Sequence, residues 1–457
     1  MHTGARNVLV VAFRFPPHGG GGVHRSAHFG HHLPAFGWRP HVLTGPEDGR
    51  RHVRDRSLLD LVEDVPVTRT GYVEVDRAYR ALGKLHLATA ARICTPWLPN
   101  LQPGWIPFGW REGRRLLERR DFDVIYSSAY PISCHVVAGL LARSSGLPWV
   151  ADYRDEWSIR EVVSWPTPAH RALAGWMDRR ITSAADRVVT TSPAHTRRFA
   201  AAFGGSDSKY VTITNGFDAR DFPDADEKAA RRRGDVFTVA HVGTLFTWRG
   251  ADPLLEAVRR VLEDGVLPED RFRVRLVGYA SEVGFEDLQR RGVLQVTGYV
   301  DHDSAVAEMR SADVLFLVNT ERTNIPAKTF EYLASGRPVL AAVRPGPTAD
   351  LIRDRRAGTV VRPDDVADVE RALRRMIAAW KDGRPPEGAS RRDVGDLTRR
   401  ELTRRLASVF REVSRTSRRR RHADMQHRDR PEAGRLPGSA RPATTSPPGS
   451  LPSQEDP

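Results

Sequence analysis

The sequence has little cysteine and no long hydrophobic run. Its 457 residues include two cysteines, Cys94 and Cys134, which are too few for a disulfide framework and fit a reducing cytosol. The longest apolar stretches, such as Val8–Phe13 and Val314–Val318, fall well short of the roughly 20 residues that span a bilayer. The N-terminus passes directly into an apolar strand pattern, so we expect no signal peptide and a cytoplasmic protein.

Signatures of metal and nucleic-acid binding are also missing. No His, Cys, Asp and Glu residues share metal-ligand spacing, so we expect no metal. The histidines His24, His28, His31 and His32 fall on one expected helix, and a metal site from their i, i+4 pairs is an alternative to exposed or cleft histidines. No carboxylate accompanies them. No nucleic-acid motif occurs, so we expect no nucleic-acid partner.

Positive charge is abundant, with a formal net charge of +14. Much of it is arginine spread along expected helices, for example Arg114-Arg115, and spread charge is typical of a solvated face. The cluster Arg418–Arg421 near the C-terminus has the chemistry to contact acidic lipid. Peripheral association with the inner face of an anionic membrane therefore stands as an alternative to a solvated surface.

Short β-branched runs alternate with amphipathic segments, which indicates an α/β fold with parallel sheets. The first set of strands is expected at residues 8–13, 41–44, 123–127, 148–152, 187–191 and 211–213, with helices at 23–33, 110–120, 132–145 and 167–184. The pattern restarts with strands at 237–242, 274–277, 294–297, 314–318, 339–342 and 359–361. We therefore expect two doubly wound, Rossmann-like domains that face a cleft.

The expected boundaries follow from composition. We assign residues 1–215 to the first domain, 216–235 to a polar linker and 236–395 to the second domain. A closing helix is expected at 396–415, with Asp396 as its N-cap. The remaining residues, 416–457, are rich in Arg, Pro, Ser and Gly, and we expect them to be disordered.

The densest chemical signal lies in the segment TNIPAKTFEYLASGRPVLA, residues 323–341. An expected helix at 327–335 has Lys328 in its first turn, and Glu331 lies one turn later on the same side. Free backbone N–H groups and a lysine at a helix start favour a phosphate, and a carboxylate nearby can accept the two hydroxyls of a ribose. The alternative is a plain amphipathic helix with Lys and Glu at its surface.

A second signal is the segment VAHVGTLFTWRGADPLLEA. The strand 239–242 runs into Gly243 and Thr244, and Arg249 follows before the next expected helix. This arrangement places backbone donors and one cation at the carboxyl end of a parallel strand, where ligands bind in open α/β sheets. The alternative is an ordinary turn with a surface arginine.

Taken together, the two segments resemble glycosyltransferase family 4, whose members have the GT-B fold. The resemblance covers most of residues 5–415 and rests on VAHVGTLFTWRGADPLLEA, NIPAKTFEYLASGRPVLA, TTSPAH, VTITNGFD, ADYRDEW and DLTRRELTRRLASVF. It implies retention of anomeric configuration without a metal or other cofactor, with a nucleotide-diphosphate sugar as co-substrate. Arg249 stands where the family usually has Lys.

The resemblance also implies site residues. Arg249 and Lys328 would stabilise the leaving nucleoside diphosphate as catalytic residues. The donor would contact Gly20, Gly21, Gly243, Thr244, Arg249, Asn324, Ala327, Lys328, Thr329 and Glu331. Acceptor-side candidates are His24, Arg25, Ser128, Tyr130, Asp152, Arg154 and Asp155.

Some of these candidates have a second interpretation. The residues Asp152, Arg154 and Asp155 could line the cleft or form an internal ion-pair network. The glycine run at 19–22 matches neither a P-loop nor a dinucleotide fingerprint, and in the resembling family it forms the wall opposite the donor site.

The sequence departs from the family pattern at three points. The first domain lacks the His that some members of the family use near the sugar, and its strand ends in DVIYSSAYP instead. Position 323 holds Thr where the first Glu of the family's E-x7-E segment is expected, and Glu321 or Asn324 are candidates to replace that carboxylate. Thr244 stands where the family usually has Arg, so one diphosphate-binding cation is absent.

The resulting hypothesis is a retaining hexosyltransferase that acts on a hydroxyl of a glycan, a lipid-linked acceptor or a secondary metabolite. A basic, apolar segment at 76–94 is a candidate interfacial helix that reaches a lipid-linked acceptor, and the alternative is an ordinary capping helix. Two alternative functions stay open: a nucleotide-sugar epimerase of similar fold, and a sugar- or nucleotide-binding protein without turnover.

Overall fold

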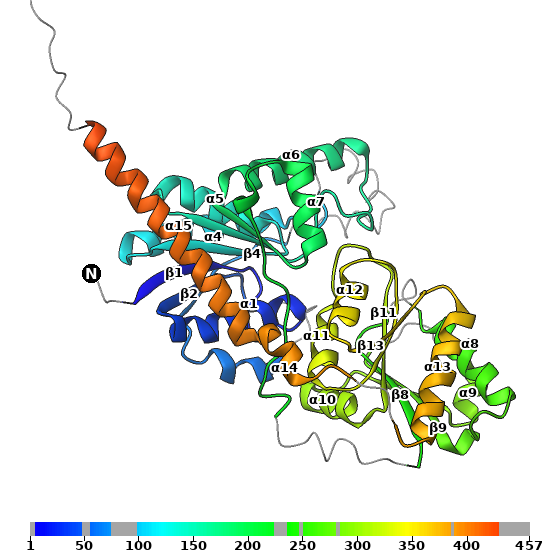
Figure 1. Ribbon diagram of the computed structural model, residues 1–457. Helices are drawn as coiled ribbons and strands as arrows, with labels where there is room; N and C mark the ends of the chain where they lie inside the picture. The colour runs from blue at the N-terminus through cyan, green and yellow to red at the C-terminus, as the bar shows by residue number, and fades with distance from the viewer. Residues whose placement is uncertain are drawn as a thin grey trace, which may run out of the picture. The chain divides into compact units, whose positions relative to one another are not determined.

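The protein contains two parallel β-sheets, each flanked by helices (Figure 1). The computed structural model describes residues 5–47, 55–74, 98–223, 235–245, 250–279, 284–384 and 388–428. We call the part built on the first sheet the N-terminal lobe and the part built on the second sheet the C-terminal lobe. The two doubly wound sheets confirm the fold class expected from the alternation of strands and helices.

The N-terminal sheet has the order β3-β2-β1-β4-β5-β6-β7, and all of its strand pairs are parallel. Its strands are β1 (Arg6–Val11), β2 (Trp38–Thr44), β3 (Val67–Arg69), β4 (Val124–Ala129), β5 (Trp149–Tyr153), β6 (Arg187–Thr190) and β7 (Tyr210–Thr212). Its helices are α1 (Gly21–His32), α4 (Ile106–Arg119), α5 (Ser133–Ser145), α6 (Pro168–Ala184) and α7 (Pro193–Phe203). The expected strands are all present, and β3 is an additional three-residue edge strand, too short to give a hydrophobic pattern.

The C-terminal sheet has the order β10-β9-β8-β11-β12-β13, again entirely parallel. Its strands are β8 (Phe237–Val242), β9 (Phe272–Val277), β10 (Leu294–Gly298), β11 (Val314–Asn319), β12 (Val339–Val343) and β13 (Gly358–Val361). The helices of the C-terminal lobe are α8 (Asp252–Glu263), α9 (Glu286–Arg290), α10 (His302–Ser311), α11 (Ala327–Ala334), α12 (Pro347–Asp354), α13 (Val366–Lys381) and α14 (Arg391–Val394). The last helix, α15 (Arg399–Arg428), follows them in the chain.

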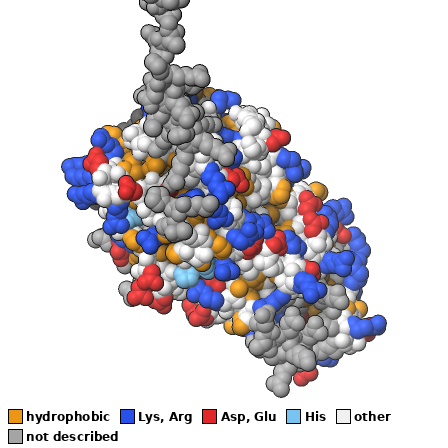
Figure 2. Space-filling model, turned by 60° about the vertical axis from the view of Figure 1, so that its left-hand side comes forward, with side chains coloured by type: hydrophobic (Ala, Val, Ile, Leu, Met, Phe, Trp, Pro, Cys, Tyr) orange, Lys and Arg blue, Asp and Glu red, His pale blue; other side chains and the backbone are white. Residues whose placement is uncertain are grey.

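Charged side chains of both signs are interspersed on the face shown in Figure 2. Several arginines there and elsewhere pair with acidic neighbours on the same helix, as Arg259 does with Glu256 and Arg404 does with Glu401. This pattern agrees with the expectation that most of the excess arginine lies on solvated helix faces.

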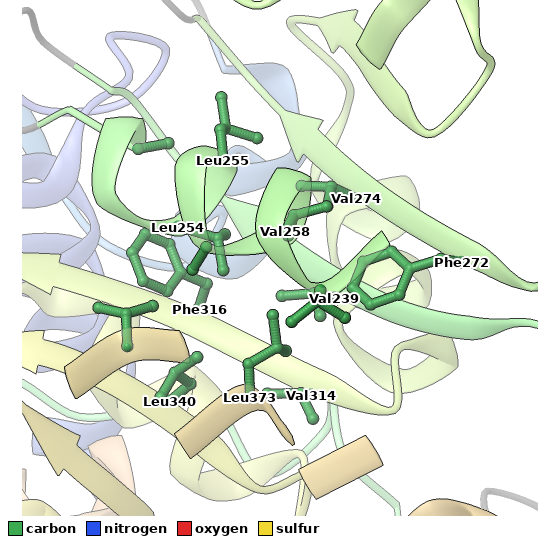
Figure 3. Packing of buried hydrophobic residues seen from close by; sticks show 14 of the residues in the cluster. Val239, Leu254, Leu255, Val258, Phe272, Val274, Val314, Phe316, Leu340 and Leu373 are labelled. Carbon is green, nitrogen blue, oxygen red and sulfur yellow. The ribbon is translucent and has the colours of Figure 1, made fainter. Parts of the chain in front are cut away.

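Apolar strands covered on both sides explain why the central strands have continuous apolar runs. On one face of the C-terminal sheet, Val239 and Val274 pack against Leu254 and Val258 of α8 and against Leu373 of α13, and all five side chains are completely buried (Figure 3). On the other face, Val242 of β8 joins a second cluster with Leu333 of α11.

The N-terminal sheet buries its two faces in separate clusters. Alternate residues of β1 point to opposite sides, so Val8 and Val10 join one cluster and Leu9 and Val11 join the other. The first cluster includes Phe410 of α15, whose ring centroid lies 5.3 Å from that of Trp38. Helix α15 therefore packs on the N-terminal sheet, as expected for the closing helix.

The closing helix differs from the prediction at both ends. It begins at Arg399, and the Thr398 hydroxyl accepts a hydrogen bond from the Glu401 N–H at 3.3 Å. Asp396 is therefore not the N-cap, and it lies in a 3₁₀ turn where it pairs with Arg355 at 2.9 Å. The helix continues to Arg428, so residues 416–428 are helical rather than disordered; residues 429–457 lie outside the described residues.

A buried ion pair joins four parts of the N-terminal lobe. The Arg25 guanidinium on α1 makes two hydrogen bonds to the Asp152 carboxylate on β5, at 2.8 and 3.0 Å, and both side chains are completely buried. Arg25 also donates to the carbonyls of Ile213 and Thr214, which follow β7, while the Tyr126 hydroxyl on β4 donates to Asp152 at 2.5 Å. The pair thus fixes α1 to the sheet centre and to the chain leaving the sheet.

A close backbone approach secures the segment after β7. A Cβ atom on Gly216 would lie 2.2 Å from the Leu397 carbonyl oxygen and 2.5 Å from Leu402 Cδ1. The adjacent Phe217 donates its N–H to that same carbonyl at 3.3 Å, and its own carbonyl accepts from the Arg399 N–H at 2.9 Å. Glycine is therefore required where the chain leaving the first sheet meets the start of α15.

We expect Gly216→Ala to lower the free energy of unfolding by about 1–3 kcal/mol, because its methyl group overlaps backbone atoms that cannot give way. The matched control is Gly175→Ala in α6, where an added Cβ meets nothing within 4 Å. Removing that helical glycine should stabilise the protein by about 0.5–1 kcal/mol. Urea unfolding followed by circular dichroism measures both, and equal effects of the two variants would contradict the prediction.

We expect Asp152→Asn to lower the free energy of unfolding by about 3–5 kcal/mol, because it leaves the buried Arg25 charge uncompensated. Glu118→Gln is the control, since the Arg114–Glu118 pair on α4 is exposed and its loss should cost no more than about 0.5 kcal/mol. Urea unfolding measures both variants. If Asp152→Asn lowers the free energy of unfolding as little as the control does, the pair has no structural role.

Candidate functional site

Each sheet reverses its strand order at one point, between β1 and β4 in the first sheet and between β8 and β11 in the second. Ligands of open α/β sheets bind in the crevice beyond the carboxyl ends of the strands at such points. The loops that follow β1, β4, β8 and β11 are therefore the expected ligand-binding loops, and most of the candidate residues lie in or beside them.

Lys328 lies over the end of β8. Gly243, which follows β8, has a φ of +150°, and a Cβ atom placed on it would lie 3.7 Å from Lys328 Cγ. The Tyr332 hydroxyl accepts a hydrogen bond from the Val242 N–H at 2.7 Å, which ties α11 to the same strand end. The positive φ favours glycine at 243, and the lysine side chain lies within ordinary contact distance of this strand end.

The loop before α11 is organised by a buried amide. Asn319 at the end of β11 is completely buried, and its Nδ2 donates to Asn324 Oδ1 at 3.1 Å and to the Glu321 carbonyl at 3.3 Å. Thr348 donates to the Asn324 carbonyl at 3.0 Å. Sequence reasoning missed Asn319, although a polar residue at the end of an apolar strand is a signal that could have identified it.

Lys328 and Glu331 form an ion pair with an Nζ–Oε2 distance of 2.5 Å. The lysine side chain is 34% exposed and the glutamate side chain 16% exposed, so both are partly accessible. Helix α11 starts after Pro326 without a side-chain cap. The site therefore combines a cation, a carboxylate and an uncapped helix start, the features expected from the sequence spacing.

The other predicted donor residues differ in accessibility. Thr244 is exposed, whereas Asn324 and Ala327 are half-buried. Thr329 was predicted to contact the donor, but it is completely buried within α11, so its side chain does not reach the surface. Arg249 lies outside the described residues.

His241 of β8 is a buried neighbour of the site. Its Nδ1 lies 2.9 Å from the Phe316 carbonyl oxygen. Burial, and then the charge of Lys328, lower the pKa of His241 to about 4, so the ring is neutral at neutral pH. It supports the strand end without adding charge to the site.

The two proposed replacements for a carboxylate at position 323 are already engaged. The Glu321 carboxylate receives hydrogen bonds from Arg160 at 3.0 and 3.1 Å and is 9% exposed, and Asn324 Oδ1 is held by Asn319. Near Thr323, burial raises the pKa of Glu156 to about 7 against the opposing charge of Arg198.

Two glycines of the run after β1 meet different structural requirements. Gly20 precedes α1 with a φ of +105°, in the left-handed region that favours glycine. A Cβ atom on Gly22 would lie 1.1 Å from Arg154 Nη1, so glycine there makes room for the guanidinium. Gly21 is the first residue of α1.

A cavity of about 240 Å³ lies beside this run, at the carboxyl ends of β1, β4 and β5. The lining residues include Arg14, Gly20, Gly22, Ser128, Tyr130 and Arg154. Three of the predicted acceptor-side residues, Ser128, Tyr130 and Arg154, are therefore brought together. Sequence reasoning missed Arg14.

The remaining acceptor-side candidates are placed elsewhere. Arg25 and Asp152 form the buried ion pair described above, so the prediction that they contact an acceptor is wrong. The internal ion-pair interpretation is right for Asp152, with Arg25 rather than Arg154 as its partner. His24 lies 3.4 Å from Asp55, and Asp155 lies 3.8 Å from Arg160.

Two further features bear on the sequence expectations. Within the described ranges, no group of three or more His, Cys, Asp or Glu side chains could hold a metal ion. The rings of His24, His28 and His32 instead stack along α1, with centroids 6.4 and 6.1 Å apart. In the same part of the chain, no helix has the length and apolar character needed to cross a membrane.

Comparison with known proteins gives matches in both lobes. Residues 20–216 match the "Glycosyl transferase 4-like domain" family, and residues 236–379 match "Glycosyl transferases group 1". A D-inositol 3-phosphate glycosyltransferase of Geodermatophilus obscurus is 27% identical over 265 residues. That match covers 51% of this chain and 57% of the relative, so the chain spans less than two thirds of the relative's length.

Solved structures share the fold. A glycosyltransferase from Rickettsia africae superposes with a TM-score of 0.60 at 12% identity, covering 90% of this chain and 99% of that one. The Anabaena protein HepE, solved with UDP and glucose, gives 0.54 at 18% identity and covers 92% and 100%. With both lobes matched in sequence and both sheets shared in structure, the chain belongs to the glycosyltransferase family 4-like proteins of the GT-B fold.

Proposed function

We propose that the protein transfers a sugar from a nucleoside-diphosphate donor to a hydroxyl group of an acceptor. The observation that carries the proposal is the pairing of Lys328 and Glu331 over Gly243, at the switch point of the second sheet. Glycosyltransferases among the sequence relatives and a fold neighbour solved with UDP and glucose support it. No observation favours the epimerase or a protein without turnover.

Lys328 would act on the leaving group. As the bond between the anomeric carbon and the phosphate oxygen breaks, negative charge develops on the departing diphosphate. The Lys328 ammonium and the N–H groups at the start of α11 supply positive charge at that place, and Arg249 is the second predicted cation. These interactions strengthen as the charge develops, so they lower the barrier rather than only holding the donor.

The reaction would proceed with retention and without a metal. The acceptor oxygen forms its bond to the anomeric carbon on the face from which the diphosphate leaves, and the acceptor proton passes to a leaving phosphate oxygen. The leaving group then serves as the base, so a pair of carboxylates of glycosidase type is unnecessary.

Glu331 would bind the ribose of the donor rather than transfer protons. Its carboxylate, 16% exposed, can accept two hydroxyl hydrogen bonds. It contacts Lys328, and a bound donor would separate the pair by taking the ammonium with its diphosphate and the carboxylate with its ribose.

The acceptor class remains wide at this stage. Glycans, lipid-linked acceptors and secondary metabolites all supply hydroxyl groups, and the acceptor named for the curated relatives does not transfer at 27% identity over half of the chain. The cytoplasmic location and the membrane association stay predictions. Segment 76–94 lies outside the described residues, and so do the side chains of Arg418–Arg421.

We expect Lys328→Ala to lower kcat by at least about 100-fold, because it removes a charge that acts mainly in the transition state. Glu331→Ala should chiefly raise the KM for the donor. The control is Arg375→Ala, an exposed arginine of α13 remote from α11 in sequence, which should retain the wild-type rate.

The measurement is release of UDP or GDP from a panel of nucleotide sugars, with and without candidate acceptors. Circular dichroism establishes that each variant is folded. A Lys328→Ala variant that turns over at the wild-type rate would show that the leaving group is stabilised elsewhere.

A further inference from the structure

The cavity at the end of β1 contains two arginines in close proximity. Arg14 follows β1, and Arg154 follows β5. Arg154 is fixed by hydrogen bonds from its Nε to the Ala129 carbonyl at 2.5 Å and from Nη2 to the Tyr130 carbonyl at 3.1 Å. Its Nη1 lies over Gly22, at the start of α1.

Arg14 lacks a counter-charge within the described residues. Its Nε is buried without a hydrogen-bond partner, and the groups that act on its charge are Arg154, Cys134 and Tyr72. Burial and the charge of Arg154 both lower the pKa of Arg14, while burial raises the pKa of Cys134 to about 12 and so keeps that thiol neutral.

Nearby carboxylates are committed to other arginines. No Asp or Glu is among the described residues that line the cavity. Asp152 on β5 is paired with Arg25, and the Oδ1 of the neighbouring Asp155 lies 3.8 Å from Arg160 Nη1. Among the described residues, two guanidinium groups therefore share one cavity without a compensating carboxylate, which is costly unless an anion occupies it.

The polar groups around the arginines suit an anion with several oxygens. Ser128 is 4% exposed at the cavity wall, and its hydroxyl, next to the Tyr126 phenol, makes no hydrogen bond of ordinary geometry within the described part of the chain. Helix α1 begins beside the cavity without a side-chain cap. Guanidinium groups bind phosphate and carboxylate through paired N–H donors.

We propose that this cavity binds an oxyanion carried by the acceptor, so that the enzyme selects acceptors with a phosphate monoester or a carboxylate. The proposal rests on the proposed transferase function. Two arginines and a helix start favour the doubly charged phosphate monoester. The volume of about 240 Å³ is below the roughly 300–1,000 Å³ of pockets for drug-sized ligands, so it admits one charged ring or headgroup.

The oxyanion is assigned to the acceptor rather than to the donor because of where the lining residues lie. All of them fall between Ala12 and Arg154, in the N-terminal lobe. The donor diphosphate is instead assigned to Lys328 in the C-terminal lobe. Two separate sets of cations imply two separately bound anions.

The first experiment measures binding of inorganic phosphate to the full chain by thermal shift, at constant ionic strength. The wild type should show a saturable rise in Tm, and Arg14→Gln should weaken phosphate binding at least tenfold. Without phosphate, the Arg14→Gln variant should have the same Tm as the wild type or a higher one, because the substitution relieves repulsion from Arg154. If Arg14 had only a structural role, the substitution would lower the Tm. The control Arg143→Gln, an exposed arginine of α5, should bind like the wild type.

Two results of this experiment would overturn the proposal. One is a phosphate effect that is absent or equal in the wild type and Arg14→Gln. The other is competition between inorganic phosphate and saturating UDP, which would assign the site to the donor. Unchanged phosphate affinity in the presence of UDP supports the acceptor.

The second experiment compares glucose, glucose 6-phosphate and glucuronate as acceptors with an active donor. A phosphate-bearing acceptor should have a kcat/KM at least tenfold above that of glucose, and Arg14→Gln should remove the advantage while leaving the donor KM unchanged. A preference for glucuronate would assign the cavity to carboxylates instead. Equal use of the neutral acceptor would refute the selection, whereas phosphate binding without any sugar transfer would count against the transferase function alone.

Discussion

The buried ion pair between Arg25 and Asp152 is the contact on which the N-terminal lobe depends. It joins α1 to β5, receives the Tyr126 hydroxyl from β4 and holds the carbonyls of Ile213 and Thr214. A buried pair of this kind is stable only when its remaining donors and acceptors are satisfied, and these backbone carbonyls satisfy the guanidinium. The pair also has a chemical consequence, because it removes the Asp152 carboxylate from the neighbouring cavity, and no other described carboxylate lines that cavity beside Arg154.

A glycine lies beside a cation at the switch point of each sheet, but for different physical reasons. Gly22 makes room for Arg154, because an added Cβ atom would lie 1.1 Å from the guanidinium Nη1. Gly243 is favoured by its backbone, with a φ of +150°, since an added Cβ atom would meet Lys328 only at an ordinary contact distance of 3.7 Å. In both places the cation provides the binding chemistry.

Local periodicity predicted most of the fold and one half of the candidate site. Apolar runs located the longer strands because both faces of each sheet are covered, and the i, i+3 spacing placed Lys328 beside Glu331. Contacts between distant segments were not predictable in this way. Arg25 and Asp152 are 127 residues apart, so their burial could not be read from either segment.

The same limitation explains the other differences. Helical spacing does not reveal that Thr329 faces the core, and Arg14 has no local pattern that separates it from other arginines. The sequence offers Asp396 two residues before Thr398, and Asp396 was predicted as the N-cap. In the structure Thr398 is the N-cap, and the Asp396 side chain pairs with Arg355. Each difference arises where a tertiary contact competes with a local preference.

The distribution of cations between the lobes follows from the electrostatics of the proposed reaction. An acceptor with an oxyanion must approach a donor that already carries a diphosphate, and two unit charges 4 Å apart repel by about 4 kcal/mol at an effective dielectric constant of about 20. One shared cation could not neutralise both ligands. Lys328 in one lobe and the pair Arg14 and Arg154 in the other would compensate each ligand at its own site, so that approach of the acceptor hydroxyl to the anomeric carbon is not opposed by the charges the ligands bring.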